Sequence, residues 1–318
     1  MIIPARTLTG SGIVLPELGL GCATLAFDAA PDALKRARKM LADAIDAGIT
    51  YFDTAPFYGR GLSERLVGDA VRGEDVIVSS KVGRLLRPDA TASTHMPFRV
   101  EYDYSHDGIL RSVEDSLQRV GLSRIDILYA HDLGVHTHGA DAPARLEEFF
   151  DGGGYRALET LRLDGTVRAI GLGVNEIAVC EQVMKRGQFD LFLLAGRHTL
   201  LERTTSSGLF KACVKAGTDI VIGGPFNSGL LVGGQTYNYH SVPDDIATQH
   251  QKLIAYCEAH QVNIGAAALQ FPLREEVVKS VIPGPKSPDE LSQIVDWMAQ
   301  DIPAAFWAGL KDLDGIGA

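Results

Sequence analysis

The sequence has little that would suit a nucleic acid or a charged membrane surface as a partner. It carries 30 lysines and arginines against 40 aspartates and glutamates, for a formal net charge of -10, and it has no basic cluster. Because phosphate backbones and anionic lipids are bound through clustered cations, both partner classes are disfavoured. No apolar run approaches the roughly 18 residues of a membrane-spanning helix. The first residues also lack the basic and apolar segments of a secretion signal.

Cysteine is scarce as well. The four residues, Cys22, Cys180, Cys213 and Cys257, are far apart and form no C-x-x-C pair. Disulfide frameworks belong mainly to small secreted domains, so we expect reduced thiols in a cytoplasmic protein. Linkers, low-complexity blocks and internal repeats are also missing, which favours a single domain over residues 1–318, present as a monomer or a small homo-oligomer.

What the chain does have is a regular alternation of strand and helix signals. Such alternation over eight strands predicts an α/β fold, the parallel (β/α)8 barrel, rather than an open sheet. A short hairpin from residues 7–8 and 13–15 is expected to close the barrel floor. Gly48 is expected to end the first helix, and Ser63 to cap the second. The predicted strands are residues 18–22, 51–53, 76–82, 125–131, 169–174, 191–195, 219–222 and 280–282.

Helical spacing predicts helices between these strands, at residues 32–47, 63–71, 108–120 and 156–163. Residues 249–260 and 266–273 compete for one helical position near the end of the chain. Long loops are expected after the third and fourth strands, following Val82 and His131.

Four polar residues come directly after three successive predicted strands. Asp53 and Tyr58 follow the second strand, Lys81 lies near the end of the third, and His131 ends the fourth. Parallel barrels gather the carboxyl ends of their strands at one mouth, where they place their chemistry. An ammonium favours ionisation of a nearby phenol, whose ordinary pKa is about 10. These residues therefore predict a proton-transfer site.

Each of the four residues also has a structural interpretation when it is taken alone. Asp53 is a plausible cap for the following turn, Tyr58 a surface aromatic, and Lys81 a solvated strand end. A single histidine such as His131 is more often a hydrogen-bonded core residue than a catalyst. Their joint position at strand ends favours the functional interpretation.

The segments around these residues resemble the aldo-keto reductase family. The resemblance lies in the segments FDTAPFYG at 52–59, VSSKV at 78–82, YAHD at 129–132, AIGLGVN at 169–175 and VIPG at 281–284. It implies that Tyr58 is the proton donor or acceptor, that Lys81 and Asp53 support it, and that His131 orients the substrate oxygen. It also implies a nicotinamide cofactor and no metal.

The resemblance places the cofactor on the later strands. Asn175 is expected to bind the carboxamide of the nicotinamide, although an Asx-turn role is an alternative. The glycine-rich turn with Ser228, Gly229 and Leu230 is expected to let backbone N–H groups approach the pyrophosphate. Thr24 and Gly284 are further cofactor candidates.

Glu290 and Lys286 bear on the choice between NAD and NADP. NADPH-preferring members of the family carry a cation one turn into the last helix, where this chain has Glu290. A carboxylate repels a 2'-phosphate and suits ribose hydroxyls, so the sequence favours NAD. Lys286 leaves NADP possible, since its ammonium is within reach of a phosphate. Ile294 occupies a position where the family often has asparagine.

The loops after the strands suggest a substrate pocket. Arg84, Phe98 and Tyr102 are expected to form one wall, and residues 132–155 a polar rim. Arg197 and His198 are further candidates, with a structural polar pair behind the sixth strand as the alternative. A metal centre built from His131, Asp132, His136, His138 and Asp141 is disfavoured, because its ligands lie on a loop without a fixed third partner.

Within the family, residues 195–201 and 223–229 look most like the bacterial sugar 1-dehydrogenases and their relatives that oxidise pyridoxal. This likeness implies oxidation of an aldose lactol, of a fucose-like sugar, at C1 to a lactone. Pyridoxal oxidation is the alternative. A non-enzymatic nucleotide-binding subunit on the same fold is a further one, because fold alone does not imply activity.

Overall fold

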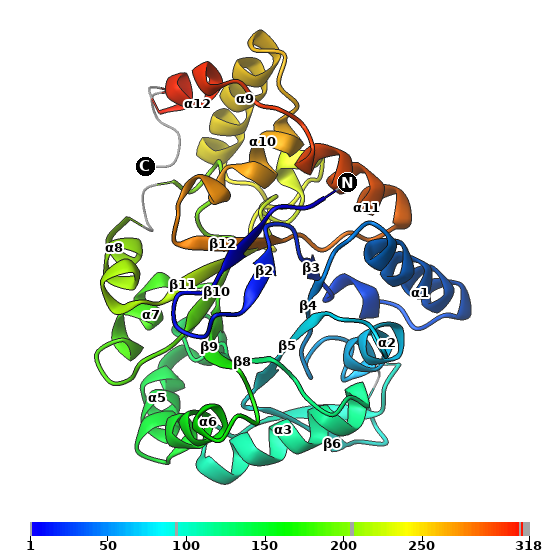
Figure 1. The fold of residues 1–318 in the computed structure, drawn as a ribbon, viewed down its shortest axis with the longest axis vertical. Helices are drawn as coiled ribbons and strands as arrows, with labels where there is room; N and C mark the ends of the chain where they lie inside the picture. The colour runs from blue at the N-terminus through cyan, green and yellow to red at the C-terminus, as the bar shows by residue number, and fades with distance from the viewer. Residues whose placement is uncertain (1, 93–94, 204–206, 312, 314–318) are drawn as a thin grey trace.

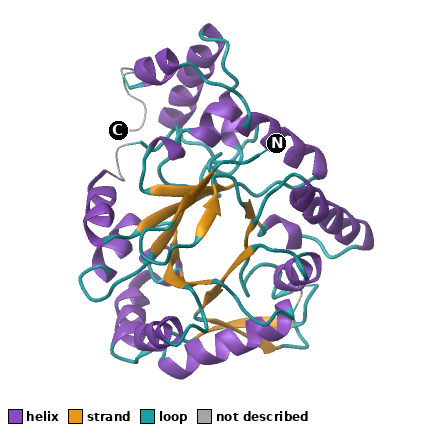
Figure 2. Ribbon diagram, viewed as in Figure 1, coloured by secondary structure: helices purple, strands orange, loops and turns teal. Residues whose placement is uncertain are grey.

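The computed structural model describes residues 2–92, 95–203, 207–311 and 313. Its centre is a parallel barrel surrounded by helices (Figures 1 and 2). The strands pair in the order β12-β11-β10-β9-β8-β5-β4-β3, and a parallel bridge between Leu18 and Val281 joins the two ends. The predicted (β/α)8 fold is therefore confirmed. The strands are β3 (Leu20–Gly21), β4 (Tyr51–Asp53), β5 (Ile77–Val82), β8 (Ile127–His131), β9 (Ala169–Val174), β10 (Leu191–Ala195), β11 (Asp219–Gly223) and β12 (Val278–Ile282).

The predicted hairpin is formed by β1 (Ala5–Thr7) and β2 (Val14–Pro16). Gly12, with φ at 69°, supplies the left-handed residue that the turn needs. The hairpin crosses the N-terminal end of the barrel (Figure 1). Its Leu8, Ile13 and Leu15 belong to one buried cluster with Tyr51 and with other inward-facing strand residues. The hairpin thus closes the floor and leaves the opposite end for chemistry.

Helices cover the outside of the barrel and bury their apolar faces against the strands. Gly48 follows the first helix with φ at 86°, as its predicted role in ending that helix requires. None of the described helices is long and apolar enough to cross a membrane. They are α1 (Pro31–Asp46), α2 (Leu62–Ala70), α3 (His106–Val120), α6 (Gly154–Leu163), α7 (Ile177–Val183), α8 (Ser207–Ala216), α9 (Asp244–Ala259), α10 (Ile264–Gln270), α11 (Pro288–Met298) and α12 (Ala304–Leu310).

The two long loops are more ordered than predicted. The first contains an antiparallel hairpin of β6 (Arg84–Pro88) and β7 (Phe98–Tyr102). The second contains α4 (Val135–His138) and α5 (Ala142–Phe150). The segments that were expected to compete for one helical position both form helices, α9 and α10.

Ser63 does not cap α2, contrary to expectation. That helix begins after Gly61, whose φ of 86° turns the chain into it. The Ser63 side chain is buried and donates instead to the carbonyl of Cys22 at 2.8 Å, while contacting Thr54 Oγ1 at the same distance. It therefore links the ends of two barrel strands. All four cysteines are free thiols and are buried.

Candidate active site

An ion pair between Asp53 and Lys81 lies at the centre of the barrel mouth. Lys81 Nζ is 2.6 Å from Asp53 Oδ2 and 3.0 Å from the carbonyl of Thr54. Both charged side chains are buried, at 2% and 3% exposure. Burial by itself lowers the Lys81 pKa, but the charges of Asp53 and Tyr58 outweigh it and raise the pKa above its ordinary value. Lys81 is therefore a permanent ammonium at neutral pH.

Tyr58 lies against this ammonium. Lys81 Nζ is 4.8 Å from the centre of the Tyr58 ring, and its positive charge acts on the phenol. Burial of the hydroxyl raises the Tyr58 pKa to about 12, although Lys81 lowers it. The ammonium thus acts in the expected direction, but in the cofactor-free site desolvation has the larger effect. The phenol is protonated at neutral pH.

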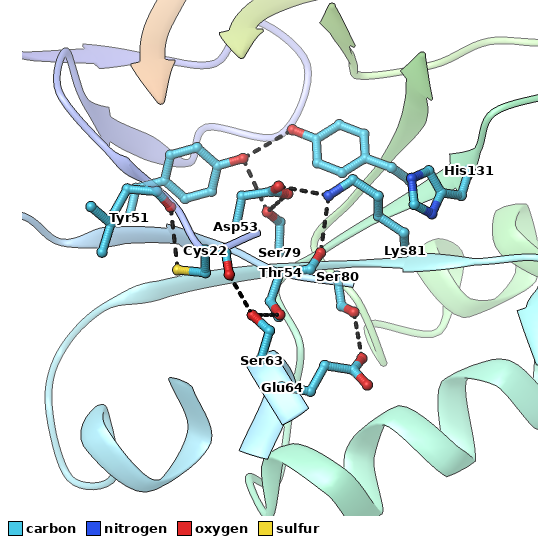
Figure 3. A network of polar contacts seen from close by, with 12 residues as sticks. Cys22, Tyr51, Asp53, Thr54, Ser63, Glu64, Ser79, Ser80, Lys81 and His131 are labelled. Atoms are coloured by element: carbon cyan, nitrogen blue, oxygen red, sulfur yellow. Dashed lines mark hydrogen bonds and ion pairs between the residues drawn. The ribbon is translucent and has the colours of Figure 1, made fainter. Parts of the chain in front are cut away.

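A chain of hydroxyl groups reaches the Asp53 carboxylate through Ser79 (Figure 3). Ser79 Oγ donates to Asp53 Oδ1 at 2.7 Å. Tyr51 contacts Ser79 at 3.1 Å and Tyr129 at the same distance. A carboxylate that is bonded on both oxygens has little freedom to rotate, so it fixes the ammonium in front of Tyr58.

His131 ends β8 beside the same group of residues. Its ring meets that of Tyr58 edge to face, with ring centres 6.0 Å apart. Burial, together with the charges of Arg84 and Lys81, holds the His131 pKa well below its ordinary value. The imidazole is therefore neutral at pH 7 and is able to donate one hydrogen bond. The structure brings all four predicted residues to one mouth.

Arg84 forms a wall beside His131. Its guanidinium stacks 4.4 Å from the centre of the Phe57 ring and 5.5 Å from that of Tyr102. It also donates a hydrogen bond to Asp132. Phe98, predicted for the same wall, lies at the other end of the β6–β7 hairpin, since it pairs with Pro88 whereas Arg84 pairs with Tyr102. The wall therefore contains Arg84 and Tyr102 but not Phe98.

His198 does not line the mouth, contrary to expectation. Its ring packs 4.6 Å from that of Phe210 and 5.1 Å from that of Phe271, in the layer of helices outside the strands. Burial there lowers the His198 pKa to about 4. Arg197 is bound to Glu202 at 2.9 Å. His198 is therefore a structural residue behind the strands rather than a residue that lines the substrate pocket.

Asn175 follows β9 at the mouth, where Tyr239 also reaches it. Asn175 donates to the carbonyl of Ala195 at 3.0 Å, and it is close enough to Tyr239 to lower the pKa of that phenol, which burial raises overall. Tyr239 and Asn238 have φ values of 71° and 46° in a tight turn, which Tyr237 and His240 close with two hydrogen bonds of 2.9 Å. Sequence reasoning missed Tyr239, because nothing in the sequence indicates that this turn points back to β9.

The glycine-rich turn is folded differently from the expectation. The N–H of Gly229 donates to Phe226 at 3.0 Å, and that of Leu230 donates to Asn227 at 3.3 Å. These two N–H groups are therefore bonded within the turn itself. The Ser228 hydroxyl accepts from the N–H of Tyr239 at 2.9 Å.

Glycines at the ends of β10 and β11 lie near Asn175. The N–H of Gly196 donates to the carbonyl of Gly223 at 2.8 Å, and a Cβ added to Gly224 would lie 3.5 Å from the Gly196 nitrogen. No side chain of these three glycines covers the strand ends. The Asn175 amide, beside this backbone, offers a donor and an acceptor, which is the chemistry that suits the carboxamide of a nicotinamide.

The remaining cofactor candidates lie together in space, where the segment after β3 meets the segment after β12. Thr24 donates to the carbonyl of Pro285 at 2.6 Å, and a Cβ added to Gly284 would lie 3.3 Å from Thr24 Cγ2. The Glu290 carboxylate accepts from the N–H of Lys286 at 2.8 Å. A cavity of about 160 Å³ lies beside Thr24 and Lys286, and its lining includes Arg36, which sequence reasoning also missed.

Comparison with known proteins agrees with this geometry. The model of the aldo/keto reductase family matches residues 17–314. The chain belongs to the aldo-keto reductase family. It is an enzyme, an oxidoreductase that uses a nicotinamide cofactor, and the non-enzymatic alternative is set aside.

Two relatives of this aldo-keto reductase match over nearly their whole length. It is 38% identical to pyridoxal 4-dehydrogenase of Microbacterium luteolum, with 96% of each chain covered. It is 37% identical to D-threo-aldose 1-dehydrogenase of Pseudomonas sp, with 95% of each chain covered. The holo form of an aldo-keto reductase from Bacillus halodurans has a similar structure, with a TM-score of 0.79, 25% identity and coverage of 98% and 96%.

Proposed function

We propose that this aldo-keto reductase oxidises an aldose lactol at C1 to a lactone. The observation that carries the proposal is the Tyr58 ring, which lies 4.8 Å from an ammonium that Asp53 holds at the barrel mouth. The relative named D-threo-aldose 1-dehydrogenase supports a sugar as the substrate class. The Asp132 carboxylate at the mouth, 19% exposed and bonded to Arg84, suits a substrate with many hydroxyls.

The residues divide the proton chemistry among them. Tyr58 exchanges the proton of the C1 hydroxyl, and Lys81 favours the ionised phenol that accepts this proton, against the burial that keeps the resting phenol protonated. Asp53 keeps Lys81 charged and in place. His131 donates a hydrogen bond to the same substrate oxygen. In total, the C1–H bond breaks as a hydride, the O–H bond breaks as a proton, and the carbonyl of the lactone forms.

A nicotinamide dinucleotide supplies the hydride acceptor and, when oxidised, a positive charge at the mouth. Asn175 would hold its carboxamide, and Thr24, Gly284 and Lys286 would hold the phosphate and ribose end. We propose NAD as the preferred form, because the Glu290 carboxylate lies one turn into α11. Arg36 and Lys286 provide cations for some use of NADP.

Pyridoxal is a second candidate substrate, because aromatic rings are exposed at the mouth. Phe57 is 43% exposed and Tyr239 is 71% exposed. The Phe57 ring lies 6.2 Å from that of His131, close enough for a substrate ring to contact both. The relative named pyridoxal 4-dehydrogenase supports this candidate. Its hemiacetal hydroxyl would meet Tyr58 in the same way.

The test is turnover by the purified wild-type protein. D-threo-aldoses, other aldoses and pyridoxal would each be offered with NAD and with NADP, and reduced cofactor would be followed by absorbance. We expect the highest kcat/KM with a D-threo-aldose and NAD, and formation of the lactone. A higher kcat/KM for pyridoxal would move the assignment to the second candidate. The absence of turnover with every substrate would refute both.

A further inference from the structure

A partly buried ion pair lies beside His131, outside the four residues that carry the proposed proton chemistry. Arg84 begins β6 and is 4% exposed, and its Nη2 donates to Oδ2 of Asp132. Asp132 directly follows His131 in the chain. Two opposite charges in a desolvated place call for a reason, because an apolar pair would avoid the cost of burying them.

The backbone of Asp132 turns its carboxylate back toward the preceding imidazole. Its φ is 51°, a conformation that is uncommon for a residue other than glycine, and its N–H is fixed to the carbonyl of Gly173 at 2.9 Å. Oδ2 consequently lies 3.4 Å from His131 Nε2. The same oxygen accepts a hydrogen bond from Arg84. The ion pair therefore fixes the position of Asp132 Oδ2, which is the acceptor that faces His131 Nε2.

The surroundings of the two ring nitrogens select one tautomer. Among the described residues, His131 Nδ1 is buried and has no hydrogen-bond partner, whereas Nε2 faces the Asp132 carboxylate. A proton on Nδ1 would be a buried donor without an acceptor, which is costly. A proton on Nε2 has an acceptor nearby. The ring is therefore neutral with its proton on Nε2.

The distance leaves this proton free for a substrate. At 3.4 Å the contact is longer than the 2.7–3.2 Å typical of N–H···O hydrogen bonds. The carboxylate therefore orients the N–H without holding it tightly. Tyr58 lies against the same imidazole, with its ring edge to face with that of His131. An oxygen bound in front of Tyr58 is thus able to accept the Nε2 proton.

Charged and polar groups from several elements surround His131. The charges facing His131 are Asp132, Arg84 and Lys81, with the phenol of Tyr58 beside them. On the other side of the strand end, the Tyr104 hydroxyl donates to the His131 carbonyl at 2.6 Å. His138 lies behind Tyr104, at 3.1 Å from its hydroxyl.

Asp132 itself is faced by Arg84, Lys81, His136 and Glu176. Alone, its negative charge would raise the pKa of Tyr58, where it already acts weakly in that direction. It would also favour protonation of His131. The Arg84 guanidinium cancels the charge but leaves the oxygen available as an acceptor.

We infer that Asp132 and Arg84 are positioning residues, which hold the neutral imidazole of His131 with its proton on Nε2 and directed at the substrate oxygen. The inference rests on the proposed function for the role of His131. It assigns Arg84 a task other than direct contact with the substrate.

Nuclear magnetic resonance of the cofactor-free protein tests the inference without any substrate. In protein labelled with ¹⁵N-histidine, long-range ¹H–¹⁵N correlations distinguish the two tautomers, and the His131 signals are assigned by their loss in His131→Asn. We expect a single Nε2–H tautomer that becomes protonated only well below pH 6.5. An Nδ1–H form or a mixture in the wild-type protein would overturn the inference.

Variants of the two partners should shift the titration of His131 in opposite directions. Arg84→Met leaves Asp132 without its cation, so the His131 midpoint should rise, and Arg84→Lys should restore it. Asp132→Ala leaves Arg84 uncompensated, so the midpoint should fall and an Nδ1–H form should appear. Unchanged tautomer and midpoint in both Arg84→Met and Asp132→Ala would refute the positioning role. If neither variant folds, the wild-type spectrum and Arg84→Lys still decide.

Kinetics separates this inference from the proposed function. In Asp132→Ala, kcat should fall, by less than the roughly 10²–10⁴ that general acid–base catalysis contributes as a whole, with a smaller change in KM. If the wild-type protein turns over no lactol or pyridoxal but shows the expected tautomer, the proposed function fails and the positioning of His131 stands. If turnover is found together with a mixed tautomer, the positioning inference fails and the function stands.

Discussion

Lys81 and Asp53 form an ion pair of 2.6 Å at the carboxyl ends of two adjacent barrel strands, and both side chains are almost completely buried. Neither charge is easily kept there without the other, since desolvation by itself lowers the Lys81 pKa. The pair therefore gives Tyr58 a permanent positive neighbour, and several predictions concern what depends on it.

Replacing Asp53 by asparagine should destabilise the protein. Breaking a buried ion pair leaves an uncompensated charge and costs roughly 3–5 kcal/mol in the free energy of unfolding. Urea denaturation of Asp53→Asn and wild type would measure this. An equal free energy of unfolding in the two proteins would contradict the ion pair. The exposed pair of Lys39 and Asp43 is the control, since Asp43→Asn should change stability by less than about 1 kcal/mol.

The pH dependence of stability below pH 10.5 should also differ between wild type and Asp53→Asn. In wild type the folded Lys81 pKa is above its ordinary 10.5, so the contribution of the pair is complete below that pH and is lost as pH rises through the folded pKa. Without Asp53, burial places the pKa of Lys81 in the folded protein below its pKa in the unfolded protein. The stability of the variant should then rise as pH approaches 10.5. The free energy of unfolding of both proteins would be measured from about pH 8 up to about 10.5, the ordinary pKa of lysine. Parallel curves for wild type and Asp53→Asn would contradict this account.

Removal of the Tyr58 hydroxyl should abolish most turnover without affecting cofactor binding. In Tyr58→Phe only the proton path is lost, so kcat should fall by about 10²–10⁴. The dissociation constant of NAD, measured by fluorescence titration, should stay nearly unchanged. Tyr155→Phe is the matched control, because that hydroxyl contacts Glu159 and Gln188 away from the mouth. Near-normal kcat in Tyr58→Phe would remove the phenol from the mechanism.

Charge reversal at Glu290 should shift the cofactor preference toward NADP. Glu290→Arg replaces a repelling carboxylate by a cation, and a gain of about 1.4 kcal/mol for the phosphate would change the ratio of the two dissociation constants tenfold. Glu290 also accepts from the N–H of Lys286 near the start of α11. Glu290→Gln keeps a side-chain acceptor without the charge, so it serves as the control. Equal weakening of NAD and NADP binding by Glu290→Arg would point to a damaged helix instead.

A side chain at Gly68 should destabilise the packing of α2 against α3. A Cβ there would lie 1.8 Å from the carbonyl oxygen of Val120, so the two helices must move apart. Overpacking of this kind costs about 1–3 kcal/mol, or more where backbone is in the way. Thermal unfolding of Gly68→Ala would measure it against Asp69→Ala, an exposed change on the same helix that should stay within about 0.5 kcal/mol. Equal melting temperatures in the two variants would contradict the close approach.

The sequence predicted the barrel and the gathering of Asp53, Tyr58, Lys81 and His131. This was possible because parallel strands bring their carboxyl ends to one mouth, and three of these residues lie within or at the end of a strand. The two-residue alternation along a strand fixes which face each side chain takes. Tyr58 lies a few residues beyond β4, where a short turn leaves it little freedom to point elsewhere.

The surrounding loops followed no such rule. Phe98 is predicted for the same wall as Arg84 but lies at the other end of the β6–β7 hairpin, and His198 is predicted for the pocket but packs against Phe210. In loops the direction of a side chain is set by positive φ angles and by partners distant in sequence. The φ values of 51° at Asp132 and 71° at Tyr239 are examples.

The amino-acid sequence by itself thus determined the architecture, the family and the order of the chemical groups, because apolar periodicity and short motifs are local properties of the chain. Only the tertiary structure decided how these groups are charged and which neighbours complete them. The pKa of Tyr58 depends on the balance between burial and the nearby Lys81. The tautomer of His131 depends on a carboxylate that the folded loop turns back toward it.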